Sequence, residues 1–413
     1  MATRYTDPGF TTNLLCLFVP GSGALPPVLA GRDDDLRVLQ GFLQRLLNNR
    51  QIPADVVIYG PRGNGKTVLL ESFRRQCEEQ GTDTLDLTPA ALGNVTDLAA
   101  HLLYDDSAIG KFLTSVTPSG LSIDLQAIGA RWDSMTPVEK DNVKRRHLVQ
   151  MLLERCRKRP LVVALDEAHT LAAEVGHTLL NASQQARKQG APFLLVVAGT
   201  PNLRDHLNQM SATFWNRAEK IGIGRLSREA TIEALAAPLA GAGITFDQDA
   251  LDRVVRESQR YPYFIQLWGE ALCHAMVDAG RFRVQTGIVE AAGPRFEASK
   301  TAYYGDRYRE LRKQGLLQAA GAVADLFAGQ ETAGYTDLSD HLVVQTGVAA
   351  QTADTQLDRL ANLGYIWQPA GDDACEPGIP SLMTYVQAQL ATAGRAATFA
   401  SQQTDKRSEC VRE

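Results

Sequence analysis

The order of apolar and polar positions predicts alternating strands and helices over the first half of the chain. Continuous apolar runs of four to six residues without polar alternation are typical of parallel strands that are buried on both faces. Strands that alternate with helical stretches predict an α/β fold, in which a parallel sheet carries helices on both sides. Strands are predicted at residues 56–59, 84–88, 161–165, 193–198 and 221–226, and an amphipathic helix with apolar residues at helical spacing is predicted at 36–47.

The second half of the chain has a different pattern, with apolar residues at helical spacing from residue 227 to about 294. This predicts a small helical domain. Farther on, helices at 316–327, 338–344 and 353–363, followed by a strand at 364–367, suit a winged helix-turn-helix. The predicted parts are an N-terminal segment (1–27), an α/β core (28–226), a helical domain (227–298), a winged helix-turn-helix (299–391) and a disordered tail (392–413), with an insert at about 100–145 in which a β-hairpin is predicted at 114–132.

The loop after the first strand has the pattern G-x-x-x-x-G-K-[ST], which is typical of nucleotide phosphate binding. Glycines let backbone N–H groups turn toward the phosphates, and the N-terminus of the following helix adds partial positive charge. Lys66 can reach the β- and γ-phosphates, and the Thr67 hydroxyl can ligate Mg²⁺. A chance glycine turn before a helix is disfavoured by the strand and helix on either side. The predicted nucleotide-binding residues of this loop are Gly60, Pro61, Arg62, Gly63, Asn64, Gly65, Lys66, Thr67 and Val68.

An acidic pair, Asp166 and Glu167, follows the apolar run 161–165 directly. Open α/β sheets bind ligands at the carboxyl ends of their strands, so acids at this position are candidates for catalysis. Asp166 would hold Mg²⁺ through its water shell, and Glu167 would orient and polarise the attacking water. Alternatively, both are solvated acids that cap the helix after the strand.

Length and composition indicate a cytoplasmic protein of two or three domains, because 413 residues are enough for several cores. The net charge of −5 gives no overall basic field that would indicate nucleic acid. Six scattered cysteines without a C-x-x-C pair are expected to be reduced thiols. The apolar run 14–19 is far too short to span a bilayer, so we expect a strand or a docking segment there and no membrane partner.

These motifs together resemble those of AAA+ ATPases, a group of P-loop NTPases. Within that superfamily the chain is similar to the replication-initiator (ORC/Cdc6-like) and archaeal-ATPase groups, over roughly residues 28 to 370. Those proteins join an ATPase core, a helical lid and a winged helix. The resemblance therefore implies ATP and Mg²⁺ as cofactors, ATP hydrolysis and nucleotide-dependent homo-oligomers.

Further residues gain roles from this resemblance. The stretch 28–36 matches the family's "GRxxEL" motif, which lies near the adenine and implies a nucleotide contact for Arg32. The last predicted core strands resemble the segments that carry sensor 1 and the arginine finger, implying that Thr200 lies at the γ-phosphate and that Arg217 acts on a neighbouring subunit. Alternatively, Arg217 is a surface arginine that pairs with Glu219 or Asp205.

The stretch 259–263 lies where related ATPases carry a Gly-x-Pro element or a sensor-2 arginine. Arg260 stands in place of the usual glycine. The lid would sense nucleotide either through the charge of Arg260 or through packing of Pro262 on the base. The alternative is a helix that begins at Pro262, with its aromatic neighbours packed in the lid core.

The tetrapeptide 166–169 also spells the box of DEAH helicases. The other helicase motifs are missing, because no Q-x-x-G-R-x-x-R run follows, and a protein kinase is excluded since H-R-D and D-F-G are missing too. We therefore expect His169 either to report nucleotide state through a hydrogen bond or to cap the end of the strand.

The sequence leaves the macromolecular partner open between DNA and protein. From residue 301 onward the chain has nine Lys and Arg against fourteen Asp and Glu, a poor surface for phosphates. A basic cluster at 144–146 and 155–159 faces either DNA, a neighbouring subunit or solvent. A basic stripe would favour a DNA loader, initiator or transposition helper, and a winged helix packed on the core would favour a signalling or defence switch that contacts protein.

Overall fold

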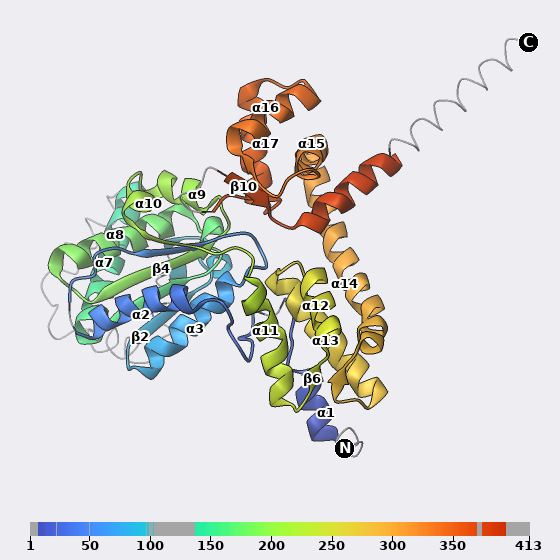
Figure 1. The fold of residues 1–413 in the computed structure, drawn as a ribbon. Coiled ribbons are helices and arrows are strands. Elements are labelled where there is room, and N and C mark those ends of the chain that lie inside the picture. Colours follow the sequence, from blue (N-terminus) through green and yellow to red (C-terminus); the bar gives the residue numbers. More distant parts are fainter. Residues whose placement is uncertain are drawn as a thin grey trace, which may run out of the picture. The chain divides into compact units, whose positions relative to one another are not determined.

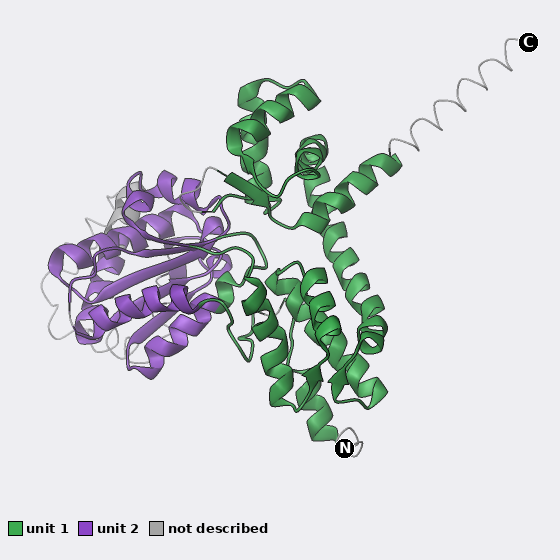
Figure 2. Ribbon diagram, in the orientation of Figure 1, with its two compact units in different colours: residues 1–32, 60–68, 222–413 green, residues 33–59, 69–221 purple. Residues whose placement is uncertain are grey.

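The computed structural model describes residues 7–21, 23–48, 50–95, 97–98, 102, 137–369 and 374–393 (Figure 1). The predicted hairpin at 114–132 and the tail beyond residue 393 lie outside these residues. The chain divides into two compact units, which are coloured in Figure 2. Unit 1 comprises Met1–Arg32, Gly60–Val68 and Gly222–Glu413, and unit 2 comprises Asp33–Tyr59 and Leu69–Ile221.

Unit 2 is built on a five-stranded sheet with the order β2-β3-β4-β1-β5. The neighbouring pairs β2 and β3, β3 and β4, and β4 and β1 are all parallel, as the continuous apolar runs predicted. All residues of β1, β3 and β4 are buried, which explains why these strands lack polar alternation. The strands are β1 (Val56–Tyr59), β2 (Asp83–Leu87), β3 (Leu161–Leu165), β4 (Phe193–Gly199) and β5 (Glu219–Gly222).

The last strand, β5, begins two residues before its predicted start at 221. The Glu219 N–H donates to the Asp55 carbonyl oxygen at 2.8 Å, so pairing begins at the polar residue that the apolar pattern excluded. Leu226, inside the predicted strand, instead donates its N–H to the Arg260 carbonyl oxygen. Ile223 and Leu226 are buried outside the strand, and the predicted strand 221–226 is wrong at both ends.

Helices cover both faces of the sheet, with α2 and α3 on one side and α7 and α8 on the other (Figure 1). Three aspartates in the first turn of α2 lie where the helix dipole favours negative charge. Gly190 ends α8 in the left-handed conformation that glycine adopts readily. The helices of unit 2 are α2 (Asp33–Leu47), α3 (Lys66–Glu79, which begins in unit 1), α7 (Pro137–Lys158), α8 (Ala173–Gln189), α9 (Leu203–Met210) and α10 (Phe214–Arg217), with 3-10 turns η2 (Pro89–Ala91) and η3 (Ala168–Thr170).

The helical part of unit 1 is centred on α13, which is almost entirely apolar. The N-terminal segment docks on it, because Leu14 and Phe18 are buried and the Phe18 ring fills the space that a Cβ at Gly269 would need. The apolar run 14–19 is therefore the end of a helix and a docking segment, and the predicted strand is wrong. The elements are α1 (Pro8–Leu15), α11 (Arg228–Gly241), β6 (Thr245–Phe246), α12 (Gln248–Glu257), α13 (Pro262–Ala279), β7 (Arg283–Val284) and α14 (Thr286–Lys313).

Beyond α14, the described residues of unit 1 form four helices and a three-stranded sheet with the order β8-β10-β9. The winged helix-turn-helix that the sequence suggests for this part stays a prediction. The boundary predicted at 298/299 falls inside α14, which continues through Pro294. The elements are α15 (Leu317–Phe327), β8 (Ala333–Gly334), α16 (Tyr335–Thr346), α17 (Ala350–Asn362), β9 (Ile366–Trp367), β10 (Ala374–Pro377) and a helix at 380–393.

A buried carboxylate joins three elements of unit 2. Asp55, immediately before β1, is 1% exposed. The Ser183 hydroxyl lies 2.6 and 2.7 Å from its two oxygens, and Arg187 Nη2 donates to it at 2.6 Å. The Leu195 N–H of β4 also donates to Asp55, at 3.3 Å. This network ties α8 and β4 to the start of β1, the strand that leads into the phosphate loop.

We expect Asp55→Ala to lower the free energy of unfolding by about 3 kcal/mol or more, because the substitution leaves a mostly buried arginine and a buried hydroxyl unpaired. Urea unfolding followed by circular dichroism measures the change. Asp34→Ala is the matched control: its carboxylate is 91% exposed and pairs with Arg37 on the surface, so we expect a loss of at most about 1 kcal/mol. Equal unfolding midpoints for the two variants would contradict a stabilising role for the network.

Candidate functional site

The candidate residues of unit 2 follow the carboxyl ends of neighbouring strands, at one edge of the sheet. β1 and β4 end side by side, because the register pairs Tyr59 with Gly199. Since β3 is parallel to β4, Asp166 and Thr200 follow neighbouring strands at this same edge. The carboxyl edge of an open parallel sheet is where such folds bind ligands. The phosphate loop also begins here in the sequence, directly after Tyr59.

The acidic pair lies at the carboxyl end of β3, as predicted. Asp166 Oδ1 accepts a hydrogen bond from the Glu167 N–H at 2.8 Å. Glu167 has a left-handed backbone (φ 48°), which is uncommon for a residue other than glycine, and its carboxylate makes no capping hydrogen bond to η3. Its side chain is 45% exposed and can therefore reach water. For Glu167 the alternative interpretation, in which both acids cap the following helix, is therefore wrong.

His169 lies between the acid and the end of β4. Its Nε2 is 3.4 Å from Glu167 Oε2, and its Nδ1 accepts from the Thr200 N–H at 3.5 Å. Both distances are at the long end of hydrogen bonding. A neutral imidazole that accepts at Nδ1 carries its proton on Nε2, so this tautomer points an N–H toward Glu167. The ring thus links the candidate base to the residue that the resemblance placed at the γ-phosphate.

Thr200 and Arg217 occupy different surroundings. Thr200 is buried, and its hydroxyl donates to Asn202 Oδ1 at 2.5 Å. Arg217 is the last residue of α10 and is exposed, with its Nε donating to the Thr213 carbonyl oxygen at 3.2 Å. Within the described part of the chain Arg217 forms no ion pair with Glu219 or Asp205, the partners of the alternative interpretation. Its position at the surface stays compatible with action on a neighbouring subunit.

The phosphate loop joins β1 to α3, so the predicted strand, loop and helix are all present. Gly63 (φ 80°) and Gly65 (φ 89°) adopt left-handed conformations, which glycine reaches readily and which let backbone N–H groups turn toward an anion. Asn64 is 1% exposed, and its Oδ1 is a buried polar atom with no hydrogen-bond partner among the described residues. A Cβ at Gly65 would meet open space. Apart from the residues next to Gly65 in the chain, no heavy atom of the described residues lies within 4 Å of that position.

Lys66 supplies the charge of this site. Its side chain is 4% exposed, and Nζ donates to the carbonyl oxygens of Gly60 and Pro61, both at 2.9 Å. A buried ammonium group, a glycine loop and the adjacent Thr67 hydroxyl suit a nucleotide phosphate with its Mg²⁺. No group of three or more His, Cys, Asp or Glu among the described residues could hold a metal by itself.

Arg32 contacts the backbone of the loop. The residue is 8% exposed, and its Nη2 donates to the carbonyl oxygens of Asn64 at 3.1 Å and of Gly224 at 2.8 Å. The resemblance gave Arg32 a place near the adenine. The structure gives it a support role for the loop, and the adenine contact stays a prediction.

In the segment 259–263 a helix begins at Pro262, as the alternative interpretation of the sequence predicted. Pro262 opens α13, while Gln259 and Arg260 are left-handed, with φ of 54° and 59°. That conformation explains why related proteins have a glycine where Arg260 stands. The Arg260 side chain is exposed. A sensor role for Arg260 or Pro262 stays untested by this geometry.

Sequence reasoning missed the residue between them. Tyr261 is fully buried, and its hydroxyl donates to the Arg62 carbonyl oxygen in the phosphate loop. Its place before a helix-opening proline predicted a core aromatic, and the ring indeed packs edge-on against Phe264. Nothing local in the sequence indicates the contact with Arg62, which lies 199 residues away along the chain.

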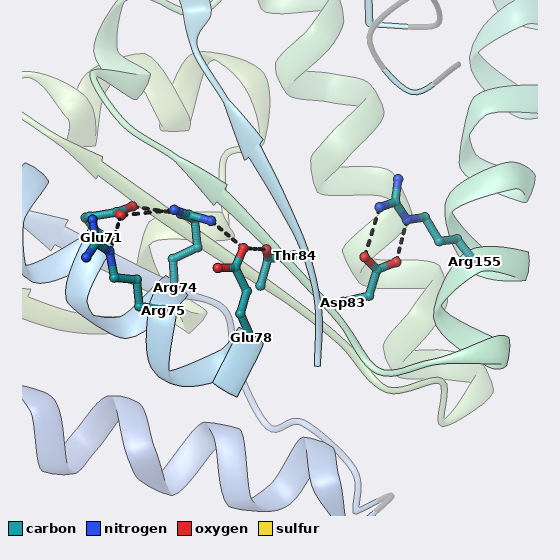
Figure 3. A network of polar contacts seen from close by, with 7 residues as sticks. All are labelled: Glu71, Arg74, Arg75, Glu78, Asp83, Thr84 and Arg155. Atoms are coloured by element: carbon teal, nitrogen blue, oxygen red, sulfur yellow. Dashed lines mark hydrogen bonds and ion pairs between the residues drawn. The ribbon is translucent and has the colours of Figure 1, made fainter. Parts of the chain in front are cut away.

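Much of the basic cluster is engaged within unit 2. Arg155 of α7 forms a bidentate pair with Asp83 of β2, at 2.6 and 2.9 Å (Figure 3). Arg157 donates to the Gln189 side chain, and Arg159 donates to the Gly81 carbonyl oxygen at 2.5 Å. These arginines join α7 to its neighbours. A further ladder along α3, which Figure 3 also shows, consists of Glu71, Arg74, Arg75 and Glu78, with Thr84 of β2 donating to Glu78.

Comparisons with known proteins add the following similarities. The family described as AAA ATPase domain matches residues 28–197. A search of curated proteins found no match. A solved structure of a Walker-type ATPase of Pyrococcus abyssi is similar over 91% of this chain and 99% of its own, with a TM-score of 0.57 and 17% identity.

Two other solved structures have lower scores. Cdc6p from Pyrobaculum aerophilum covers 91% of this chain and 99% of its own at 16% identity, with a TM-score of 0.48. The RuvB Holliday junction branch migration motor of Thermotoga maritima covers 84% and 92% at 15% identity, with a TM-score of 0.44. No helix among the described residues is long and apolar enough to cross a membrane.

At 17% identity the similarity to the Pyrococcus abyssi protein concerns the fold, and the family match concerns the sequence of the sheet unit and its phosphate loop. Both agree with the parallel sheet and the strand, loop and helix around Lys66. Residues 28–197 therefore match an AAA ATPase domain in sequence, and the chain has a P-loop NTPase fold.

Proposed function

We propose that this protein hydrolyses ATP to ADP and phosphate with Mg²⁺, and that its nucleotide state controls assembly or a conformational switch. The observation that carries the proposal is the buried Lys66 ammonium group in a glycine loop that faces open space. A buried cation in a glycine loop whose backbone N–H groups can turn toward a ligand favours binding of an anion.

Each proposed role follows from the chemistry of the side chain. The loop N–H groups and Lys66 bind the β- and γ-phosphates, and Thr67 and Asp166 hold Mg²⁺ directly or through water. Glu167 polarises the attacking water, since its carboxylate is half-exposed and His169 lies beside it. The proposed role of Thr200 is a polar contact at the γ-phosphate.

We further propose that the output is a switch whose C-terminal part contacts protein. Within unit 1 the winged-helix segment lies against the loop and the residues after β5. A Cβ at Gly364 would lie 3.4 Å from Pro61 Cβ, which is ordinary van der Waals contact. Arg225 pairs with Glu376 of β10 at 2.8 Å. A segment in contact with the phosphate loop can respond to nucleotide there.

The charge of the C-terminal part supports the same choice over a DNA loader. α17, the helix that a winged helix would present to DNA, has exposed Gln351, Thr352, Asp354 and Asp358 with a single arginine, Arg359. Such a surface offers little for counterion release from DNA. The arginines of the cluster at 155–159 are engaged in unit 2 as described above.

Two substitutions test the proposed hydrolysis, and we expect a different outcome for each. Lys66→Ala should abolish binding of ATP, because it removes the buried positive charge from the loop. Glu167→Gln should keep ATP binding, while kcat falls about 10²-fold or more since the amide cannot polarise water. Release of phosphate measures turnover, and Glu174→Gln, another partly exposed glutamate of unit 2, is the control. Turnover of Glu167→Gln at the parental rate would show that Glu167 is not the base.

Self-association should increase with nucleotide if Arg217 acts on a neighbouring subunit. Light scattering with a non-hydrolysable ATP analogue should show a rise in mass. Arg217→Ala should bind ATP with nearly unchanged affinity yet lose hydrolysis, because charge on the γ-phosphate is no longer neutralised. Lys188→Ala, an exposed cation at the end of α8, serves as the control. Hydrolysis that is independent of protein concentration and insensitive to Arg217→Ala would instead indicate a monomeric switch.

Duplex DNA should bind weakly to the full chain, with a dissociation constant above the micromolar range at about 150 mM salt, because the C-terminal part has an excess of acidic residues. Fluorescence anisotropy of a labelled duplex measures this. Residual binding should fall steeply with salt and depend on Lys144, Arg145, Arg146 and the cluster at 155–159. Micromolar or tighter binding that Arg359→Ala abolishes would restore the DNA-loader interpretation.

A further inference from the structure

The hydroxyl of Tyr261 contacts the phosphate loop. Tyr261 precedes α13 and is completely buried, and its hydroxyl donates to the Arg62 carbonyl oxygen. Burial raises the pKa of Tyr261 well above its ordinary value, so the hydroxyl keeps its proton and remains a donor.

The direction of a carbonyl fixes the direction of the next N–H group. The peptide unit is planar, and no cis peptide bond occurs among the described residues, so C=O and N–H of one unit point in opposite directions. When Tyr261 holds the Arg62 carbonyl, the Gly63 N–H must point away from Tyr261. Arg32 acts in the same way on the Asn64 carbonyl and therefore directs the Gly65 N–H.

Gly63 accommodates the tyrosine ring through its missing side chain. A Cβ at this position would overlap the Tyr261 hydroxyl and lie 2.7 Å from its Cζ. The left-handed backbone at Gly63 also disfavours other residues. The close approach of ring and backbone leaves the Arg62 carbonyl no alternative position without loss of this packing.

A second tyrosine supports the first. Tyr303 of α14 lies with its hydroxyl oxygen 3.1 Å from that of Tyr261. Because the single hydroxyl proton of Tyr261 goes to Arg62, Tyr303 is the donor in this pair. A hydroxyl that accepts one hydrogen bond donates the next one more strongly. The order Tyr303, Tyr261, Arg62 is thus a polarised chain that ends at the loop.

We propose that Tyr261 is a positioning residue for nucleotide binding, which acts by holding the Arg62 carbonyl so that the Gly63 N–H faces the bound phosphates. Its effect is on affinity, because the N–H group contacts phosphate in the ground state as well as in the transition state. Tyr303 strengthens the effect from α14. This inference rests on the proposed function, since it presupposes that the loop binds nucleotide phosphates.

The test compares three Tyr→Phe variants of the full-length chain. Each removes one hydroxyl and keeps the ring. Tyr304→Phe is the matched control: Tyr304 lies in the same aromatic cluster and is buried, but its hydroxyl is bonded to Ser381 and not to the loop. Anisotropy of methylanthraniloyl-labelled ATP gives the dissociation constant, and phosphate release gives KM and kcat. Thermal unfolding checks that all variants are folded.

Tyr261→Phe should weaken ATP binding about tenfold and raise KM in parallel, with kcat within about twofold of the parent. Tyr303→Phe should weaken binding about two- to threefold, because the polarising donor alone is lost. Tyr304→Phe should bind as the parent does, even if its melting temperature falls by as much as that of Tyr261→Phe. A purely structural role would move melting temperatures without this order of affinities.

Equal ATP affinity of the parent and Tyr261→Phe would overturn the inference while leaving the proposed function intact. So would a loss of affinity in Tyr304→Phe as large as that in Tyr261→Phe. If the parent itself bound no labelled ATP, the proposed function would fail and the inference with it. Should Tyr261→Phe not fold, Tyr303→Phe decides, because it leaves Tyr261 in place, and parental affinity in that variant would overturn the inference.

Discussion

A buried ammonium group needs hydrogen-bond acceptors close by, because burial removes it from water. At Lys66 two carbonyl oxygens of its own loop accept from Nζ, although a full negative charge would match it better. Several contacts hold the loop around Lys66. Arg32 and Tyr261 fix the alternate carbonyls, the two left-handed glycines turn the N–H groups, and β1 and α3 hold the loop at both ends. An anion in the loop would complete the arrangement.

The sequence predicted those parts of the fold that depend on local pattern. The continuous apolar strands were placed to within one residue at 56–59 and 161–165, because burial on both faces leaves a signal in every position. Strands of two residues, such as β8 and β9, carry no period that could reveal their bounds. The shift of β5 has another cause, a backbone hydrogen bond from Glu219 that no side-chain pattern encodes.

In the candidate site too, residues in local motifs could be predicted and residues that depend on distant contacts could not. The motif residues Lys66, Asp166 and Glu167 could be identified because their spacing relative to strands is fixed by the chemistry. The partners of the loop could not, because Arg32 and Tyr261 reach it through contacts 32 and 199 residues apart. His169 was noticed only through its tetrapeptide, and its position beside Thr200 depends on which strands are neighbours in the sheet.

The three glycines of the phosphate loop differ in which atoms surround them. A side chain at Gly60 would collide with the Ile223 carbonyl, and one at Gly63 would collide with Tyr261, whereas Gly65 has open space around it. Two of the three glycines are thus required by close contacts within the protein as well as by any ligand. Transplanting this loop alone onto another scaffold would discard the reason for those two glycines, because the Ile223 carbonyl and the Tyr261 ring that exclude their side chains would be absent.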